Sequence, residues 1–229
     1  MRALVTGATG FLGAQLVNEL ESSGYLVRIL SRSENSRYDT ILCDLAKQNI
    51  PDSAFYKVDV IFHLAGYTHD TEYRQDKWSS YYDLNIKATI ALAEKAVKHN
   101  IKKFIFISSV KAGGVVFNDD CMSESNQENP VDMYGLSKRQ AEVKILKIGE
   151  ESDMHVAIVR PSLTYGYNMK GNLATMYSGI KKGWFPSLPQ INNKRSMICI
   201  YDLVQAILLV AKHKSTNGNI YIATDGKQY

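Results

Sequence analysis

The feature that most limits the possible folds is a glycine-rich stretch, TGATGFLG at residues 6–13, between a short β-forming run and an amphipathic segment. Gly7 permits a sharp turn out of a strand, Gly10 lets the backbone approach a phosphate, and Gly13 allows close packing of a helix on a strand. The stretch therefore predicts a helix N-terminus that faces a dinucleotide pyrophosphate. The alternative interpretation is a tight turn in another α/β fold.

The rest of the chain alternates short β-rich runs with longer helical ones. Strands are predicted at residues 3–6, 26–30, 40–43, 60–65, 103–107 and 154–159, and helices at 11–22, 76–100 and 133–150. Several strands are apolar throughout, which indicates burial on both faces. The pattern predicts an α/β fold with a doubly wound parallel sheet, and a dinucleotide-binding domain over residues 1–161.

Beyond Pro161 the composition changes. Glycine, proline, asparagine and aromatic residues increase between residues 162 and 193, which indicates loops and one helix at 172–182. A strand at 197–200, a helix at 203–213 and a strand at 219–223 follow. We expect residues 162–229 to form a small, incomplete substrate-binding region, interleaved with the last elements of the dinucleotide-binding domain.

Charge and composition exclude several classes of function. The 229 residues include 27 basic and 23 acidic ones, and the basic residues are scattered rather than gathered in the stripe of a nucleic-acid-binding protein. The apolar runs are too short to span a membrane. The three cysteines and five histidines lack the spacing of a disulfide framework or a metal site. We therefore expect a cytoplasmic protein with no metal, no membrane span and no nucleic-acid partner.

The end of the second predicted strand bears on the choice of cofactor. An acidic residue there would bind the ribose 2′-hydroxyl of NAD, but the chain reads RILSRS at residues 28–33. Ser31 and Arg32 suit a 2′-phosphate, because a guanidinium group binds phosphate bidentately. NADP(H) is therefore favoured over NAD(H). The alternative is that Arg32 is a solvated cation in a loop.

A second constellation concerns proton transfer. Tyr134 and Lys138 lie four residues apart on a predicted helix and so share one face. A lysine cation beside a phenol is expected to lower the pKa of the phenol, which could then exchange a proton with a substrate hydroxyl. Ser109 ends the fifth strand, where a doubly wound sheet binds its ligands. The alternatives are a helix-face pair and a strand-end serine that bonds to loop backbone.

Eight stretches together resemble the extended short-chain dehydrogenase/reductases of the NAD(P)-dependent epimerase/dehydratase type, which act on nucleotide sugars. These stretches are TGATGFLG (6–13), CDL (43–45), HLAG (63–66), LNIKAT (84–89), FIFISS (104–109), YGLSK (134–138), RPSLTYG (160–166) and RSMICIYDL (195–203). They occur in the order of the family and cover nearly the whole chain. The resemblance implies a Rossmann fold and a Ser109–Tyr134–Lys138 catalytic triad.

The resemblance also implies a set of cofactor-binding residues. Asp44 and Leu45 would lie beside the adenine, and Pro161 beside the nicotinamide carboxamide. Asn85 matches an asparagine near the cofactor, or alternatively a buried amide that braces the strand ends. The full set comprises Gly7, Gly10, Phe11, Leu12, Gly13, Arg32, Asp44, Leu45, Leu64, Ala65, Gly66, Asn85, Tyr134, Lys138 and Pro161.

Three short stretches resemble enzymes of bacterial surface-polysaccharide synthesis, among them UDP-glucose 4-epimerase-like proteins and UDP-4-keto-sugar reductases. They are SSVK (108–111), KGNL (170–173) and NKRS (193–196). The resemblance implies a UDP-sugar substrate that contacts Ser109, Lys111, Asn172, Leu173 and Arg195. Arg195 would clamp the diphosphate, or alternatively is a surface cation. Either 4-epimerisation or 4-keto reduction fits, whereas a dehydratase would carry acidic residues where Val110 and Lys111 stand.

The chain is shorter than members of this family usually are, which leaves a second class of function open. A catalytically impaired module or truncated paralogue would bind NAD(P) without turning over a sugar. The joint presence of Ser109, Tyr134 and Lys138 speaks against a pure binding module, because binding alone does not need them. Relatives often dimerise through the long helices that correspond to residues 76–100 and 133–150, so a homodimer is expected.

Overall fold

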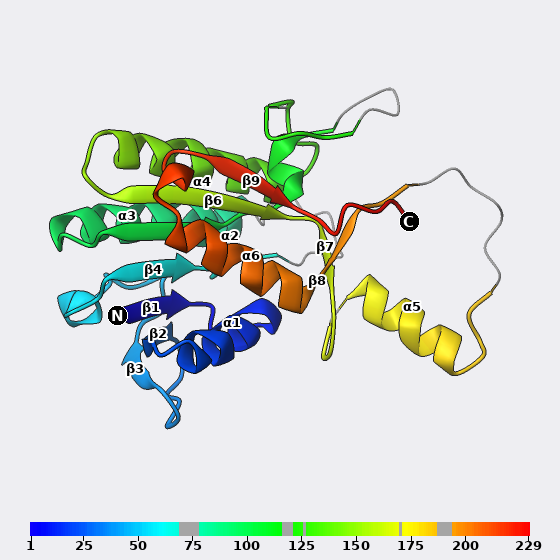
Figure 1. Ribbon diagram of the computed structural model, residues 1–229, viewed down its shortest axis with the longest axis horizontal. Helices are drawn as coiled ribbons and strands as arrows, with labels where there is room; N and C mark the ends of the chain where they lie inside the picture. The colour runs from blue at the N-terminus through cyan, green and yellow to red at the C-terminus, as the bar shows by residue number, and fades with distance from the viewer. Residues whose placement is uncertain (69–77, 116–120, 126, 170, 187–193) are drawn as a thin grey trace.

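A seven-stranded parallel sheet forms the centre of the computed structural model, which describes residues 1–68, 78–115, 121–125, 127–169, 171–186 and 194–229 (Figure 1). Its strands are β1 (Arg2–Thr6), β2 (Leu26–Ser31), β3 (Asp39–Leu42), β4 (Val60–His63), β5 (Lys103–Ile107), β6 (His155–Pro161) and β9 (Ile220–Ala223). The strand order is β3-β2-β1-β4-β5-β6-β9. The chain reverses direction across the sheet between β1 and β4, which opens a ligand crevice at their carboxyl ends. The predicted doubly wound α/β fold is confirmed.

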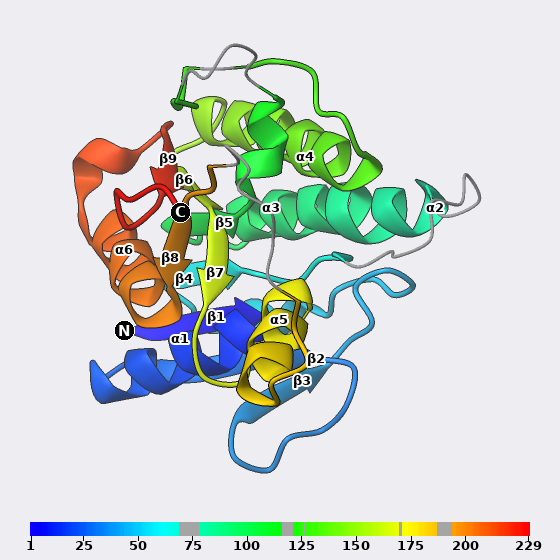
Figure 2. The ribbon, with the colours of Figure 1, turned by 90° about the vertical axis from the view of Figure 1, so that its right-hand side faces the viewer.

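Helices cover both faces of this sheet. α1 (Phe11–Ser22) and α6 (Ile200–Lys212) pack on one face, and α3 (Ala88–Lys98) and α4 (Met133–Glu150) pack on the other (Figure 2). Strand β5 shows the alternation, because Ile105 points into the α1–α6 core and Phe104 and Phe106 into the α3–α4 core. All three side chains are fully buried, as the apolar sequence of the strand predicts.

The segment predicted as one helix over residues 76–100 is divided into three parts. α2 (Trp78–Tyr81) runs into a π-helical segment, η3 (Tyr82–Lys87), before α3 begins, and residues 76 and 77 lie outside the described part. A π turn inserts an extra residue into the helix, and such turns are frequent at functional sites. The side chain of Asn85 in η3 is fully buried and bonded to two other segments, a tertiary constraint that helical periodicity does not reveal.

The C-terminal part contains a small two-stranded sheet, of which the sequence predicted one strand. β8 (Met197–Cys199) confirms the strand predicted at residues 197–200, and it pairs in parallel with β7 (Leu163–Tyr165), which was not predicted. α5 (Asn172–Lys181) lies apart from the layers of the main sheet (Figure 1). α6 begins at Ile200, three residues before its predicted start, and β9 returns the chain to the central sheet beside β6.

Short 3₁₀ turns complete the described elements: η1 (Asp52–Phe55), η4 (Val110–Gly113) and η5 (Lys214–Thr216). The turn η4 follows β5 directly and packs beside α4. Among the described residues, no helix is long and apolar enough to cross a membrane.

Candidate active site

A cleft of about 990 Å³ opens at the carboxyl ends of the strands. It is bounded by the turn after β1, the end of β2, the loop after β4, the end of β5 and the start of α4. Most of the residues predicted to form the site line this one cleft: Gly7, Gly10, Phe11, Leu12, Gly13, Arg32, Asp44, Leu45, Leu64, Ala65, Gly66, Ser109, Tyr134, Lys138 and Pro161. The fold thus brings segments from residue 7 to residue 161 to one place.

The glycine-rich turn has the geometry of a phosphate cradle. Gly7 has a φ of +72°, and a Cβ there would lie 2.8 Å from the backbone nitrogen of Ala65. A Cβ on Gly13 would lie 2.0 Å from the carbonyl oxygen of Gly7. No side chain caps α1 and no acidic residue lies in its first turn, so its N-terminus is available to an anion. The turn fits the pyrophosphate of a dinucleotide.

The far end of the cleft carries both acidic and basic groups. Asp44 accepts a hydrogen bond from the backbone of Ala46 at 3.1 Å, and its other oxygen lies 3.9 Å from Nζ of Lys47. The end of β2 contributes Ser31, Arg32 and Ser33 to the lining, as does the loop after β3 with Lys47. Lys47 and Ser33 were not predicted, because nothing in their local sequence marks them.

The proposed catalytic residues meet at the junction of β5 and α4. Asp132 caps α4 by accepting a hydrogen bond from the backbone of Gly135 at 2.7 Å, which sets the direction of the helix two residues before Tyr134. The side chains of Tyr134 and Ser109 are hydrogen-bonded to each other. Nζ of Lys138 donates to the carbonyl oxygen of Ile107 at 3.0 Å and lies 4.6 Å from the ring centroid of Phe106.

The pKa of Tyr134 differs from the prediction. Burial raises the pKa of Tyr134 to about 12, although the hydrogen bond with Ser109 acts in the opposite direction. The expected lowering of this pKa by Lys138 was wrong. Lys138 is itself fully buried, which lowers the pKa of its ammonium group to about 8, and its proton is directed at a backbone carbonyl. Burial is the largest influence on the pKa of both Tyr134 and Lys138.

Asn85 does not line the cleft. Its amide accepts from the backbone nitrogen of Tyr67 at 2.7 Å, and donates to the carbonyl oxygen of Tyr67 at 3.0 Å and to Oγ of Ser137 at 2.9 Å. Of the two predicted roles, the structure supports the buried amide that braces the strand ends. This bracing holds the loop after β4 against α4.

Of the predicted substrate contacts, Ser109 lines the cleft, whereas Lys111, Leu173 and Arg195 lie outside its lining. Lys111 forms an ion pair with Asp132 at 2.6 Å, and Leu173 lies in the first turn of α5. Arg195 is exposed, and its backbone pairs with that of Tyr229. The side chain of Asn172 lies outside what the structure describes. Apart from Ser109, these residues therefore do not form one described pocket with Tyr134.

Several further residues line the cleft without having been predicted as cofactor or substrate contacts. They include Thr9, Cys43, Tyr67, Thr68, Ser80, Asp83, Ser162 and Thr164, and also Ser108, which the sequence marks only as one of two hydroxyl groups at the end of the fifth strand. Within the described part of the chain, the Oγ atoms of Ser108 and Ser162 are buried and have no hydrogen-bond partner. Hydroxyl groups of this kind leave hydrogen-bonding capacity at the ends of β5 and β6, where a ligand would bind. In the sequence, the one signal for Ser108 and Ser162 as site residues is that they adjoin Ser109 and Pro161.

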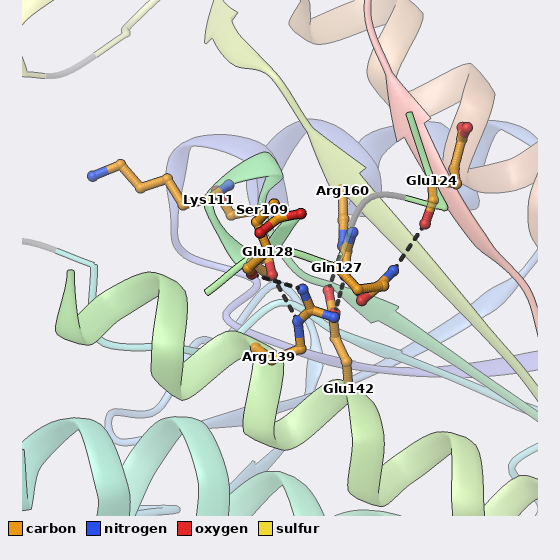
Figure 3. Close-up of polar contacts among 9 residues, drawn as sticks. Ser109, Lys111, Glu124, Gln127, Glu128, Arg139, Glu142 and Arg160 are labelled. Carbon is orange, nitrogen blue, oxygen red and sulfur yellow. Dashed lines mark hydrogen bonds and ion pairs between the residues drawn. The ribbon is translucent and has the colours of Figure 1, made fainter. Parts of the chain in front are cut away.

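Two buried groups close to the cleft are structural. His63 is bonded through both ring nitrogens, to Oγ1 of Thr6 at 2.6 Å and to Oγ1 of Thr89 at 2.8 Å, and burial lowers its pKa to about 3. Arg160 and Glu142 form a buried bidentate ion pair, with Nε–Oε1 and Nη2–Oε2 distances of 2.9 and 2.5 Å (Figure 3). The pair ties β6 to α4 one turn beyond Lys138.

Comparison with known proteins agrees with this geometry. Residues 3–223 match the model of the NAD dependent epimerase/dehydratase family. A UDP-glucose 4-epimerase of Vibrio cholerae is 32% identical over 232 residues, which cover 97% of this chain and 70% of that protein. An N-acetyl-alpha-D-glucosaminyl-diphospho-ditrans,octacis-undecaprenol 4-epimerase of Escherichia coli O157:H7 is 27% identical, with coverages of 97% and 66%.

Solved structures share the fold. MoeE5 in complex with UDP-glucose and NAD superposes with a TM-score of 0.87 at 24% identity, over 100% of this chain and 78% of that one. UDP-glucuronic acid 4-epimerase from Bacillus cereus, in complex with UDP-glucuronic acid and NAD, gives a TM-score of 0.87 at 22% identity, over 100% and 79%. At these identities the likeness shows the fold alone. Together with the family match over residues 3–223, it shows that the chain belongs to the NAD dependent epimerase/dehydratase family.

Proposed function

We propose that this chain transfers a hydride between a nicotinamide dinucleotide and the C4 position of a UDP-sugar, with Tyr134 as the acid/base. The observation that carries the proposal is that Ser109, Tyr134 and Lys138 line the same cleft as the glycine-rich turn. A pyrophosphate bound at that turn would extend the cofactor toward Pro161 and Tyr134. The resemblance to 4-epimerases and 4-keto reductases supports C4 as the reacting position.

The cofactor, when bound, supplies the acceptor or donor of the hydride. Tyr134 exchanges a proton with the sugar O4, and Ser109 holds that oxygen through a hydrogen bond. Lys138 orients the ribose and adds positive charge near the phenol. 4-Keto reduction uses the protonated phenol once as a proton donor, whereas 4-epimerisation needs the same transfer in both directions.

NADP(H) is the proposed cofactor in preference to NAD(H). The end of β2 contributes Ser31, Arg32 and Ser33 to the described cleft lining and no carboxylate. A guanidinium group between two hydroxyl groups suits a 2′-phosphate. The remaining proposed cofactor contacts are the other lining residues that were predicted from the sequence. Asn85 would support the cofactor site indirectly, through its hydrogen bonds with Tyr67 and Ser137.

The proposed substrate contacts are Ser109, Lys111, Asn172, Leu173 and Arg195, which rest on the resemblance to enzymes of polysaccharide synthesis. We also propose a homodimer in which the α3–α4 sides of two copies pack together. Exposed Val143 and Leu136 on α4, and Tyr82 on η3, support this interface. A cytoplasmic location is supported by the three cysteines, which are all free thiols.

The decisive experiment follows NADPH consumption with UDP-4-keto-6-deoxy-N-acetylglucosamine, beside NAD⁺-dependent 4-epimerisation of UDP-glucose. Wild type is compared with Tyr134→Phe and with Tyr177→Phe, whose ring is exposed on α5. We expect turnover with one substrate, a loss of about 10³-fold in Tyr134→Phe and none in Tyr177→Phe. Cofactor binding without turnover of either sugar would instead favour a catalytically impaired module.

A further inference from the structure

An ion pair lies beside the phenol of Tyr134 and is not explained by cofactor binding. Nζ of Lys111, on η4, lies 2.6 Å from Oδ2 of Asp132, the residue that caps α4. The same ammonium group lies 6.0 Å from the ring centroid of Tyr134. Neither Lys111 nor Asp132 lines the cleft. The ammonium group and the carboxylate therefore lie beside Tyr134 but outside the lining of the cleft.

The pair connects the two segments that carry the hydrogen-bonded Ser109 and Tyr134. Ser109 caps η4, and its Oγ accepts from the backbone nitrogen of Lys111 at 3.3 Å. On the other side, Oδ1 of Asp132 accepts from the backbone of Gly135 at 2.7 Å. Each member of the ion pair is thus attached to the local structure that presents one catalytic side chain.

Within the part of the chain that the structure describes, three further groups lie around Tyr134. Tyr81 of α2 lies with its ring centroid 6.5 Å from that of Tyr134. Lys138 follows one turn later on α4, and Asp83 of η3 lines the same cleft. Because Lys138 is buried and bonded to a backbone carbonyl, its position does not change with solvent. Lys111 and Asp132 are partly exposed, so mutation can change their charges without disturbing the core.

We propose that the Lys111–Asp132 ion pair is a positioning element that balances the charge beside Tyr134, with the carboxylate disfavouring the phenolate and the ammonium group favouring it. The inference deepens the proposed function, since it concerns the acid/base residue of that reaction. It predicts that the two single neutral variants shift the ionisation of Tyr134 in opposite directions. A purely structural brace predicts shifts in one direction, because loss of either partner would weaken the hydrogen bond with Ser109.

The test measures the ionisation of Tyr134 directly, by NMR of protein labelled with ¹³C at Cζ of tyrosine. Tyr134→Phe assigns the resonance, and the protein is saturated with whichever oxidised nicotinamide dinucleotide binds more tightly. The positive charge of that cofactor lowers the pKa of a neighbouring phenol. Because the readout does not depend on turnover, a protein that is inactive toward both sugars can still be tested.

We expect Asp132→Asn, which keeps an oxygen to cap α4, to lower the midpoint by about half a pH unit. Lys111→Met should raise it by about the same amount, and the double variant should return it close to wild type. Lys111→Arg should match wild type. Lys147→Met, which removes the pair with Glu151 at the far end of α4, is the control and should shift nothing.

Two results would overturn the proposal. One is a shift of the same sign in Asp132→Asn and Lys111→Met, which assigns the pair a structural role only. The other is an Asp132→Asn midpoint that does not fall below that of wild type, including the case in which neither protein titrates up to about pH 11, near the ordinary range of tyrosine. An active enzyme should show the same opposite shifts in the pH dependence of kcat.

Discussion

The proposed cofactor side and the proposed substrate side of this molecule are built differently. On the cofactor side, backbone atoms come within van der Waals contact at Gly7 and Gly13, and the Arg160–Glu142 pair is fully buried. On the substrate side, Tyr177, Ile180 and Trp184 around α5 are all more than half exposed. A two-stranded sheet connects this part to the rest. The region around the glycine-rich turn is therefore closely packed, whereas the region around α5 is open to solvent.

The proposed function gives a physical reason for this difference. A pyrophosphate is bound by backbone N–H groups at a helix N-terminus, which requires close packing and leaves no room for a Cβ. A sugar is bound by side chains, which can be supplied from loops and exposed helices. Mutations on the cofactor side should therefore have larger effects than matched ones on the substrate side.

The largest expected effect comes from the buried ion pair. Glu142→Gln leaves the Arg160 guanidinium without its charged partner in the core, so the free energy of unfolding should fall by about 3 kcal/mol. Urea denaturation measures it. Glu151→Gln, which affects an exposed pair on the same helix, is the matched control and should change the value by less than about 0.5 kcal/mol. Equal effects would mean that the buried pair stabilises the protein no more than an exposed pair on the same helix.

The next effect concerns the phosphate cradle. The methyl group of Gly13→Ala would lie 2.0 Å from the carbonyl oxygen of Gly7, so α1 must move away from the turn. Nicotinamide dinucleotide affinity should fall by about 100-fold, or about 2.7 kcal/mol, in a fluorescence titration. Gly171→Ala, at the start of α5, has open space for the methyl group but a φ of +79°, so it strains the backbone locally, outside the cleft, and should retain the affinity. Thermal unfolding of both variants separates lost binding from lost structure.

A pH effect should follow from His63. The unfolded chain takes up a proton on His63 below about pH 6.5, whereas the folded protein does so only near pH 3. Stability from this group is therefore full above pH 6.5 and declines as the pH falls, by about 1.4 kcal/mol per pH unit. Urea denaturation at pH 6.5 and 5 should show a shallower decline in His63→Gln. An equal decline in both proteins would mean that His63 is not buried as a neutral ring.

A smaller effect is expected at the end of β2. Arg32→Ser removes the guanidinium group proposed to bind the 2′-phosphate, so the ratio of NADPH to NADH affinity should fall by about 10-fold. Arg37→Ser is the matched control, since Arg37 pairs with Glu21 and does not line the cleft. A fall in the affinity for NADH as well would show that Arg32 binds a group common to both cofactors.

The smallest effect on stability is expected from Arg195→Ala on the substrate side. Its side chain is exposed and forms no described ion pair, so unfolding free energy should stay within about 0.5 kcal/mol of wild type. Cofactor affinity should also be unchanged. The proposed diphosphate clamp predicts a raised KM for the UDP-sugar, and an unchanged KM would leave Arg195 a surface cation.

Elements with strong local signals were predicted with their correct ends. α1, β5 and α4 have the predicted bounds, because periodicity, apolar runs and the glycine-rich turn are local properties. The π-helical segment η3 and the strand β7 were missed. η3 contains Asn85, whose amide bonds to a loop 18 residues earlier and a helix 52 residues later, and β7 exists through its pairing with β8.

The sequence by itself determined the doubly wound sheet, the phosphate turn and the identity of about half of the cleft residues, because apolar strand patterns and glycine spacing are properties of short segments. Only the tertiary structure decided the electrostatics of the site. Burial raises the pKa of Tyr134, Lys138 turns to a backbone carbonyl, and Lys111 pairs with Asp132. A pKa depends on solvent exclusion and on distances between segments far apart in the chain, and neither quantity is contained in residue spacing.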